Sequence, residues 1–222
     1  MGSDKPDATW LFQRCDSSSA KPMFPNGQHS ESWWTALFSL FLLHQNVSGK
    51  CPEIALHQPH RPQPGESDWT YLPMGALDYK GLTFSSFLTE RQLNAKLATS
   101  FFGVQTWPQE FTKLAVDLVI MFPAERRAVL IENKTVGTEE GRLHSYAKVM
   151  RFLKDNGLTA DLYVLISRGH PSEKILPAIE EDKLRVILWE DVLRLMTQDS
   201  FFSQIFKTDN TDLARYCDFA DP

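Results

Sequence analysis

The sequence predicts an α/β protein in which a mixed β-sheet is flanked by helices. Two observations carry this prediction. The apolar segments KLAVDLVIMFP (113–123) and AVLIENKTV (128–136) are separated by a Glu-Arg-Arg turn (125–127), which predicts a β-hairpin. A helical pattern at 139–155 and the apolar segment ADLYVLIS (160–167) follow, and they predict a helical crossover to a further strand.

The segments before the hairpin are predicted from local signals. The run ESWWTALFSLFLLHQ (31–45) is apolar on nearly all sides and predicts a buried helix. Residues 46–82 contain several prolines and glycines, and they predict a loop-rich insertion with short strands near 69–72. The segment FLTERQLNAKLATSFFG (87–103) predicts an amphipathic helix that begins with a Thr-x-x-Gln capping box at 89–92.

The segments after residue 167 predict a helix, a strand and another helix, at 171–183 with a kink at Pro177, at 184–189 and at 190–198. The organisation expected is an N-terminal extension packed on the core (1–82), the core itself (83–198) and a C-terminal tail (199–222). The tail carries phenylalanines that are expected to dock on the domain, Phe201, Phe202 and Phe206.

Length and composition favour one sizeable domain with its own core. The chain has 222 residues, of which 42% are hydrophobic and 23% charged, as in ordinary globular proteins. The formal net charge of −5 excludes a strongly basic coat for nucleic acid, although binding depends more on local basic clusters than on the total. The three widely separated cysteines, with no apolar signal region and no apolar run long enough for a bilayer, predict a reduced, cytoplasmic chain.

Three charged residues interrupt the two apolar strands. Asp117 lies in the middle of LAVDLVI, and Glu132 and Lys134 follow the apolar run of the next strand. Because the period of a strand is two residues, Glu132 and Lys134 lie on one face with Cα atoms about 6.6–6.8 Å apart, whereas Asn133 points the other way. A carboxylate among Val and Leu side chains costs stability unless it has a partner. The three side chains therefore predict either a structural salt bridge or a site, and a divalent cation would neutralise the two carboxylates.

Asp117, fourteen residues and then Glu132-Asn133-Lys134 resemble the PD-(D/E)XK nuclease superfamily, and within it the uncharacterised bacterial and phage-type members. The resemblance covers about residues 84–195. It implies a restriction-endonuclease-like fold, in which helices flank a mixed central sheet, with residues 1–82 as a helical and irregular extension. The chain departs from the family at Val116, where the family has Pro, and at Arg142, where related members often have Gln.

The resemblance implies that Asp117, Glu132 and Lys134 are catalytic and that the cofactor is Mg²⁺ or Mn²⁺. Asp117, Glu132 and the backbone carbonyl of Asn133 would hold the metal, and Glu90, expected on the preceding helix, would bind it through a water. Magnesium favours one or two carboxylates together with waters and phosphate oxygens. The structural alternative is an Asp117–Lys134 salt bridge with an exposed Glu132 and with Glu90 favoured by a helix dipole.

A basic face is predicted on the helix at 139–155. Arg142, Lys148 and Arg151 recur on it, and such a face either lies along a phosphate backbone or is simply solvated. The function implied by the resemblance is a metal-dependent nuclease that hydrolyses DNA, in restriction, phage defence or repair. The alternative is a catalytically inactive module of the same fold that binds nucleic acid or a protein. RNA as substrate, a homodimer and a protein partner all stay open, and no membrane contact is expected.

Overall fold

The computed structural model describes residues 31–60, 70–83, 86–92, 95–134, 140–166 and 184–207. The helix expected at 171–183 lies outside these residues, and so do residues 1–30 and 208–222. The elements, in chain order, are α2 (Glu31–Ser48), β1 (Ala55–His60), β2 (Thr70–Ala76), β3 (Phe87–Gln92), α3 (Ala95–Phe102), η2 (Gln109–Phe111), β4 (Ala115–Phe122), η3 (Pro123–Glu125), β5 (Arg127–Lys134), α4 (Glu140–Asp155), β6 (Thr159–Ile166), β7 (Leu184–Leu188), α5 (Trp189–Gln198) and α6 (Phe202–Lys207).

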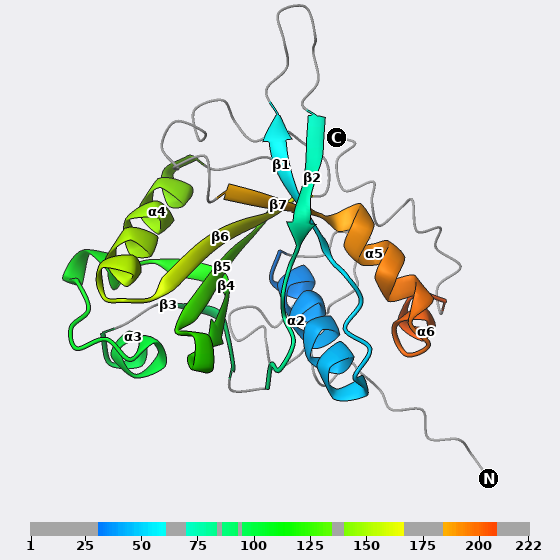
Figure 1. Ribbon diagram of the computed structural model, residues 1–222, viewed down its shortest axis with the longest axis horizontal. Coiled ribbons are helices and arrows are strands. Elements are labelled where there is room, and N and C mark those ends of the chain that lie inside the picture. Colours follow the sequence, from blue (N-terminus) through cyan, green and yellow to red (C-terminus); the bar gives the residue numbers. More distant parts are fainter. Residues whose placement is uncertain are drawn as a thin grey trace, which may run out of the picture.

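Within the described residues, seven strands form one mixed sheet in the order β2-β1-β7-β6-β5-β4-β3 (Figure 1). Strands β5, β6 and β7 are parallel, and the neighbours on both sides pair antiparallel. The predicted hairpin is confirmed as β4 and β5, and the predicted crossover is confirmed as α4 between β5 and β6. No helix of the described residues is both long and apolar enough to cross a bilayer.

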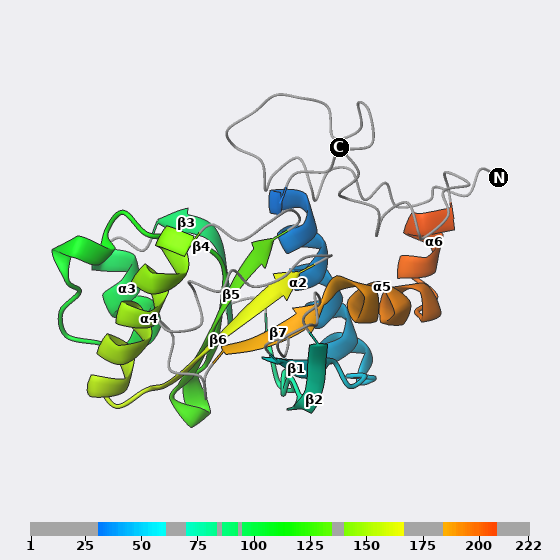
Figure 2. The ribbon, with the colours of Figure 1, turned by 90° about the horizontal axis from the view of Figure 1, so that it is seen from above.

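Helices cover both faces of the sheet, as Figure 2 shows, with α2 and α5 on one side and α3 and α4 on the other. Strand β4 is apolar toward both sides because both are covered. Leu118 and Ile120 pack in the core under α2 and α5, whereas Val119 and Met121 pack in the core under α3 and α4. The predicted α/β architecture of a mixed sheet flanked by helices is therefore confirmed.

The helix predicted at 87–103 is wrong in its first half. Residues Phe87–Gln92 form strand β3, which pairs antiparallel with β4, and only Ala95–Phe102 is helical. The capping box at 89–92 is consequently wrong as well. The physical reason is that β4 would otherwise be an edge strand with a row of open backbone groups, and β3 pairs with them.

The loop-rich prediction for 46–82 missed strand β1 and shortened β2. Strand β1 joins the sheet beside β7 through the His57–Val186 pair, and β2 is the outer strand. Pro59 and Pro73 argued against these strands, because proline cannot donate to a ladder. Among the described strands β2 is the outer one, and an outer strand tolerates proline because one row of its backbone groups need not bond to a neighbour. This accounts for Pro73 of β2 but not for Pro59 of β1.

The tail begins as expected from its aromatic residues. Phe202 is fully buried, at the start of α6, and it packs edge-on against Phe41 of α2 with ring centroids 5.3 Å apart. Phe201 is 36% exposed, and the side chain of Phe206 lies outside the described part of the chain.

Candidate functional site

The β4–β5 hairpin brings Asp117 and Glu132 to neighbouring positions. Leu118 pairs with Ile131, so Asp117, one residue before, lies opposite Glu132, one residue after. Opposite residues of an antiparallel pair share a face of the sheet, with Cβ atoms about 4.5–5.5 Å apart. Strand alternation from Leu130 places Glu132 on the side of α3 and α4.

The two carboxylates differ in exposure. Glu132 is fully buried, which contradicts the exposed Glu132 of the structural alternative, whereas Asp117 is half-buried. The Asp117 carboxylate accepts a hydrogen bond from the backbone N–H of Asn133, with Oδ2 2.8 Å from the nitrogen. This bond joins the acidic residue of β4 directly to the segment that carries Glu132 and Lys134.

The side chain of Asn133 lies on the other side of the sheet, as strand alternation requires. Its Nδ2 donates to Thr35 Oγ1 of α2 at 3.2 Å, and its Oδ1 accepts from Trp189 Nε1 of α5 at 2.9 Å. All three residues are at most 2% exposed. Thr35 and Trp189 were not identified from the sequence. The signal that the sequence offered was the amide side chain of Asn133 within an apolar strand.

Lys134 ends strand β5 and pairs with Ile166 of β6. Its side chain lies outside the described residues. Glu90, expected on a helix, is instead in strand β3, and this correction follows from the pairing of β3 with the open edge of β4. Between the Thr89–Leu118 and Arg91–Val116 pairs, Glu90 occupies the register position opposite Asp117.

The residues around Asp117 have the chemistry of a magnesium site in part. Carboxylate and carbonyl oxygens suit Mg²⁺ and Mn²⁺, and Mg²⁺ commonly uses only one or two carboxylates with waters and substrate oxygens. Among the side chains that the structure describes, no group of three or more His, Cys, Asp or Glu could hold a metal ion. The fit therefore depends on Asp117, Glu132 and the Asn133 carbonyl, with Glu90 in register beside them.

Helix α4 begins six residues after β5 ends and turns its apolar side to the sheet. Tyr146 is fully buried there, and its hydroxyl donates to the Ala115 carbonyl of β4. Lys148 and Arg151 are exposed on the outer side of the helix, while the side chain of Arg142 lies outside the described residues. The structure thus places two of the three predicted basic residues where a large ligand has access to them.

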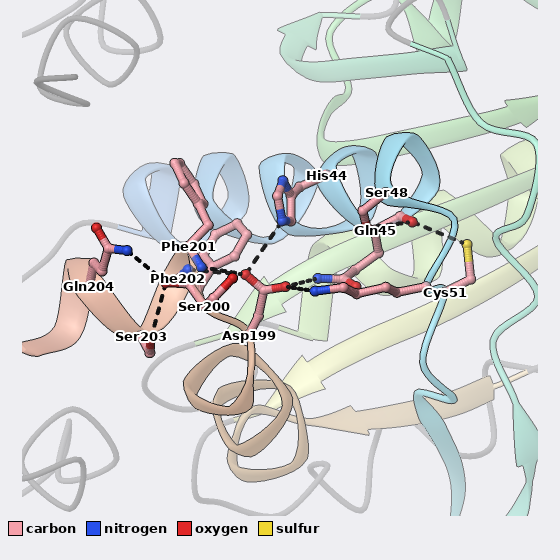
Figure 3. A network of polar contacts seen from close by, with 11 residues as sticks. His44, Gln45, Ser48, Cys51, Asp199, Ser200, Phe201, Phe202, Ser203 and Gln204 are labelled. Atoms are coloured by element: carbon pink, nitrogen blue, oxygen red, sulfur yellow. Dashed lines mark hydrogen bonds and ion pairs between the residues drawn. The ribbon is translucent and has the colours of Figure 1, made fainter. Parts of the chain in front are cut away.

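A second polar cluster joins the C-terminal part of α2 to the end of α5 (Figure 3). Asp199 is its centre: the carboxylate accepts from Gln45 Nε2 at 3.1 Å and from the Phe201 and Phe202 backbone amides at 2.9 and 3.2 Å. His44 and Lys50 approach it at 3.4 and 3.5 Å. Burial alone raises the pKa of Asp199, but the hydrogen bonds and His44 outweigh burial and hold that pKa at about 2.

The Asp199 cluster differs in kind from the hairpin site, because hydrogen-bond donors and cations surround a single carboxylate. Asp199 begins the turn into α6, and its backbone carbonyl accepts from the Ser203 amide at 2.8 Å. The cluster therefore fixes the tail against α2, which is a structural role.

Comparisons of the chain with protein-family models, with curated proteins and with solved structures found no match.

Proposed function

We propose that the chain is a metal-dependent nuclease of the PD-(D/E)XK type that hydrolyses DNA phosphodiester bonds, in restriction, phage defence or repair. The observation that carries this proposal is the hydrogen bond from the Asn133 amide to the Asp117 carboxylate. It ties the acidic residue of one hairpin strand to the Glu-x-Lys segment of the other. The opposed positions of Asp117 and Glu132 support the same conclusion.

Asp117, Glu132 and the backbone carbonyl of Asn133 would hold Mg²⁺ or Mn²⁺, with Glu90 contributing through a water. When bound, the metal polarises the scissile phosphate and lowers the pKa of a water. Lys134 orients that water and offsets the negative charge that develops on the phosphate. Lys148 and Arg151 of α4, with Arg142, contact the phosphate backbone of the substrate.

The second candidate is a catalytically inactive module of the same architecture that binds nucleic acid or a protein. The full burial of Glu132 favours it, because an ionised carboxylate withdrawn from solvent has less access to a hydrated cation and to substrate. The net charge of −5 favours it as well.

A comparison of wild type with Glu132→Gln separates the two candidates. The substitution keeps the shape of the side chain and removes its charge. Melting curves with and without Mg²⁺, and time courses on plasmid DNA and on an RNA of matched length, are recorded for both proteins. Glu110→Gln, at an exposed position of η2, is the control for the loss of one negative charge.

In the nuclease, Mg²⁺ raises the melting temperature of wild type and of Glu110→Gln, both proteins cut DNA, and Glu132→Gln loses both properties. If wild type cuts the RNA but not the DNA, the proposed substrate changes from DNA to RNA and the proposed metal-dependent hydrolysis stands. A wild type that neither gains stability from Mg²⁺ or Mn²⁺ nor cuts either nucleic acid would leave the binding module as the function.

A further inference from the structure

Thr35, Asn133 and Trp189 form a buried contact that we name the amide clamp. We infer that the amide clamp positions the metal site: it fixes the backbone of β5 at Asn133, and through it the carboxylate of Asp117. Thr35 and Trp189 are thus positioning residues supplied by α2 and α5. This inference rests on the proposed function, because it concerns the same site.

The chemistry of the clamp allows one orientation of the Asn133 amide. The indole N–H of Trp189 only donates, so the atom that faces it at 2.9 Å must be the Asn133 oxygen. The Asn133 nitrogen then faces Thr35 and donates to its hydroxyl oxygen. Both ends of the amide are consequently engaged, in a place where none of the three residues is more than 2% exposed.

The backbone of Asn133 carries the effect across the sheet. Its side chain is held on the side of α2 and α5, while its N–H donates to the Asp117 carboxylate of the neighbouring strand β4. A turn of the Asn133 peptide would lengthen that bond and move the Asn133 carbonyl, which the resemblance makes a metal ligand. Groups that hold ligands in this way affect metal binding without touching the metal.

Helix α2 supports the clamp twice. It supplies Thr35 directly, and its Trp34 and Phe38 pack edge-on against the Trp189 ring, with centroids 5.0 and 6.0 Å apart. Helix α2 is therefore part of the machinery that shapes the site, although it lies on the opposite side of the sheet from Glu132.

The test uses paired substitutions in the full chain. Thr35→Val removes the hydroxyl at nearly constant shape, and Thr35→Ser restores it. Trp189→Phe removes the indole N–H and keeps an aromatic ring. The control is Tyr79→Phe, which removes another buried hydrogen bond, from the Tyr79 hydroxyl to the Pro52 carbonyl at 2.7 Å. Tyr79 lies beside Asn46, about 16 Å along α2 from Thr35 at 1.5 Å per residue.

Two quantities are measured on each protein: the hydrogen-exchange rate of the Asn133 backbone amide without metal, and the affinity for Mn²⁺ by calorimetry. Thr35→Val and Trp189→Phe are expected to speed exchange at Asn133 and to weaken Mn²⁺ binding about 10–100-fold. Thr35→Ser should return both quantities toward wild type. Tyr79→Phe should leave both near wild type, whatever its melting temperature.

Each outcome decides something. If wild type binds Mn²⁺ and the clamp variants match Tyr79→Phe in exchange and affinity, the positioning role is wrong and the proposed function stands. If Thr35→Ser fails to restore what Thr35→Val loses, the hydroxyl is not the operative group and the clamp inference fails. If wild type binds no Mn²⁺ and cuts nothing, the proposed function fails, and the inference about its site fails with it.

Discussion

The two sides of the sheet differ in the polar groups that they bury. On the side of α2 and α5, polar groups meet complementary partners: Asn133 meets Thr35 and Trp189, and Asp199 meets Gln45. At the end of the β4–β5 ladder, two carboxylates follow the Leu118–Ile131 pair: Asp117, which accepts the Asn133 N–H, and the fully buried Glu132. Like charges at such positions are unfavourable.

Under the proposed function, this difference separates groups that stabilise the fold from groups that would bind the metal. Hydrogen bonds between complementary buried groups lower the free energy of the folded state. Neighbouring carboxylates raise it, and in the proposed nuclease a cation bound between them would offset their repulsion. Substitutions on the side of α2 and α5 should therefore change stability first, and substitutions at the hairpin should change activity first.

The largest expected effect is that of Lys134→Met, which removes the ammonium and keeps an apolar side chain of similar length. In the proposed nuclease, loss of one comparable electrostatic donor lowers the rate about 10²–10³-fold. Mg²⁺ binding should survive, because Asp117 and Glu132 are intact. Plasmid-cleavage time courses and melting curves with and without Mg²⁺ measure both effects, with Lys113→Met, at an exposed position before β4, as control.

The structural alternative gives the opposite result for Lys134→Met. If the ammonium serves mainly to compensate a buried carboxylate, its loss destabilises the fold by about 3–5 kcal/mol. Suppose that Lys134→Met loses this stability and that wild type shows no response to Mg²⁺. The polar groups on both sides of the sheet would then serve stability alone.

The next largest effect is expected at Asp199, on the side of the sheet that α2 and α5 cover. Asp199→Asn keeps an oxygen that accepts from the Phe201 and Phe202 amides but removes the charge that faces His44 and Lys50. The depressed pKa of Asp199, about 2 against an ordinary 3.8, corresponds to roughly 2 kcal/mol of stability at pH 7. Urea denaturation at pH 7 should show that loss, while the response of the melting temperature to Mg²⁺ stays that of wild type. Unchanged stability would contradict the structural role of the cluster.

Whether a contact of the fold could be predicted depends on how far apart its two partners lie in the sequence. The β4–β5 hairpin was predictable because two apolar runs and the turn between them are adjacent in sequence. The strand at Phe87–Gln92 was not, because helical spacing in the following residues extends plausibly backward over it. Only the edge of β4, more than twenty residues later, decides in favour of a strand.

The residues of the candidate site also divide according to how far from their partners they lie in the sequence. Asp117, Glu132 and Lys134 could be singled out as candidates because a charge inside an apolar strand is a local anomaly. Thr35 and Trp189 were not found, since they lie 98 and 56 residues from Asn133. A hydrogen bond over such a separation leaves no periodic pattern, so only the packing of α2 and α5 on the sheet reveals it.

The Asp199 contribution should also have a defined dependence on pH. The folded-state pKa is lower than the unfolded one, so the stabilisation is fully present above about pH 4 and is lost as the pH falls through about 2. The difference in unfolding free energy between wild type and Asp199→Asn should therefore be constant from pH 7 to about pH 4 and shrink below it. Urea denaturation at a series of pH values measures it. A difference that already shrinks between pH 7 and pH 5 would contradict the assignment of this stabilisation to the Asp199 carboxylate.

The smallest effect is expected at the basic residues of α4, which touch neither core. Lys148 and Arg151 are exposed, so Lys148→Ala and Arg151→Ala should leave the melting temperature unchanged. If each side chain contacts one phosphate, the slope of log affinity against log salt for duplex DNA falls by about 0.9 per substitution and by about 1.8 in the double variant. Filter binding at several salt concentrations, with Ca²⁺ in place of Mg²⁺ to prevent cleavage, measures the slope. Lys80→Ala, which removes an exposed lysine in the turn between β2 and β3, is the control and should leave the slope of wild type. Equal slopes for wild type and all four variants would assign the outer face of α4 to solvent and confine the functional surface to the hairpin end of the sheet.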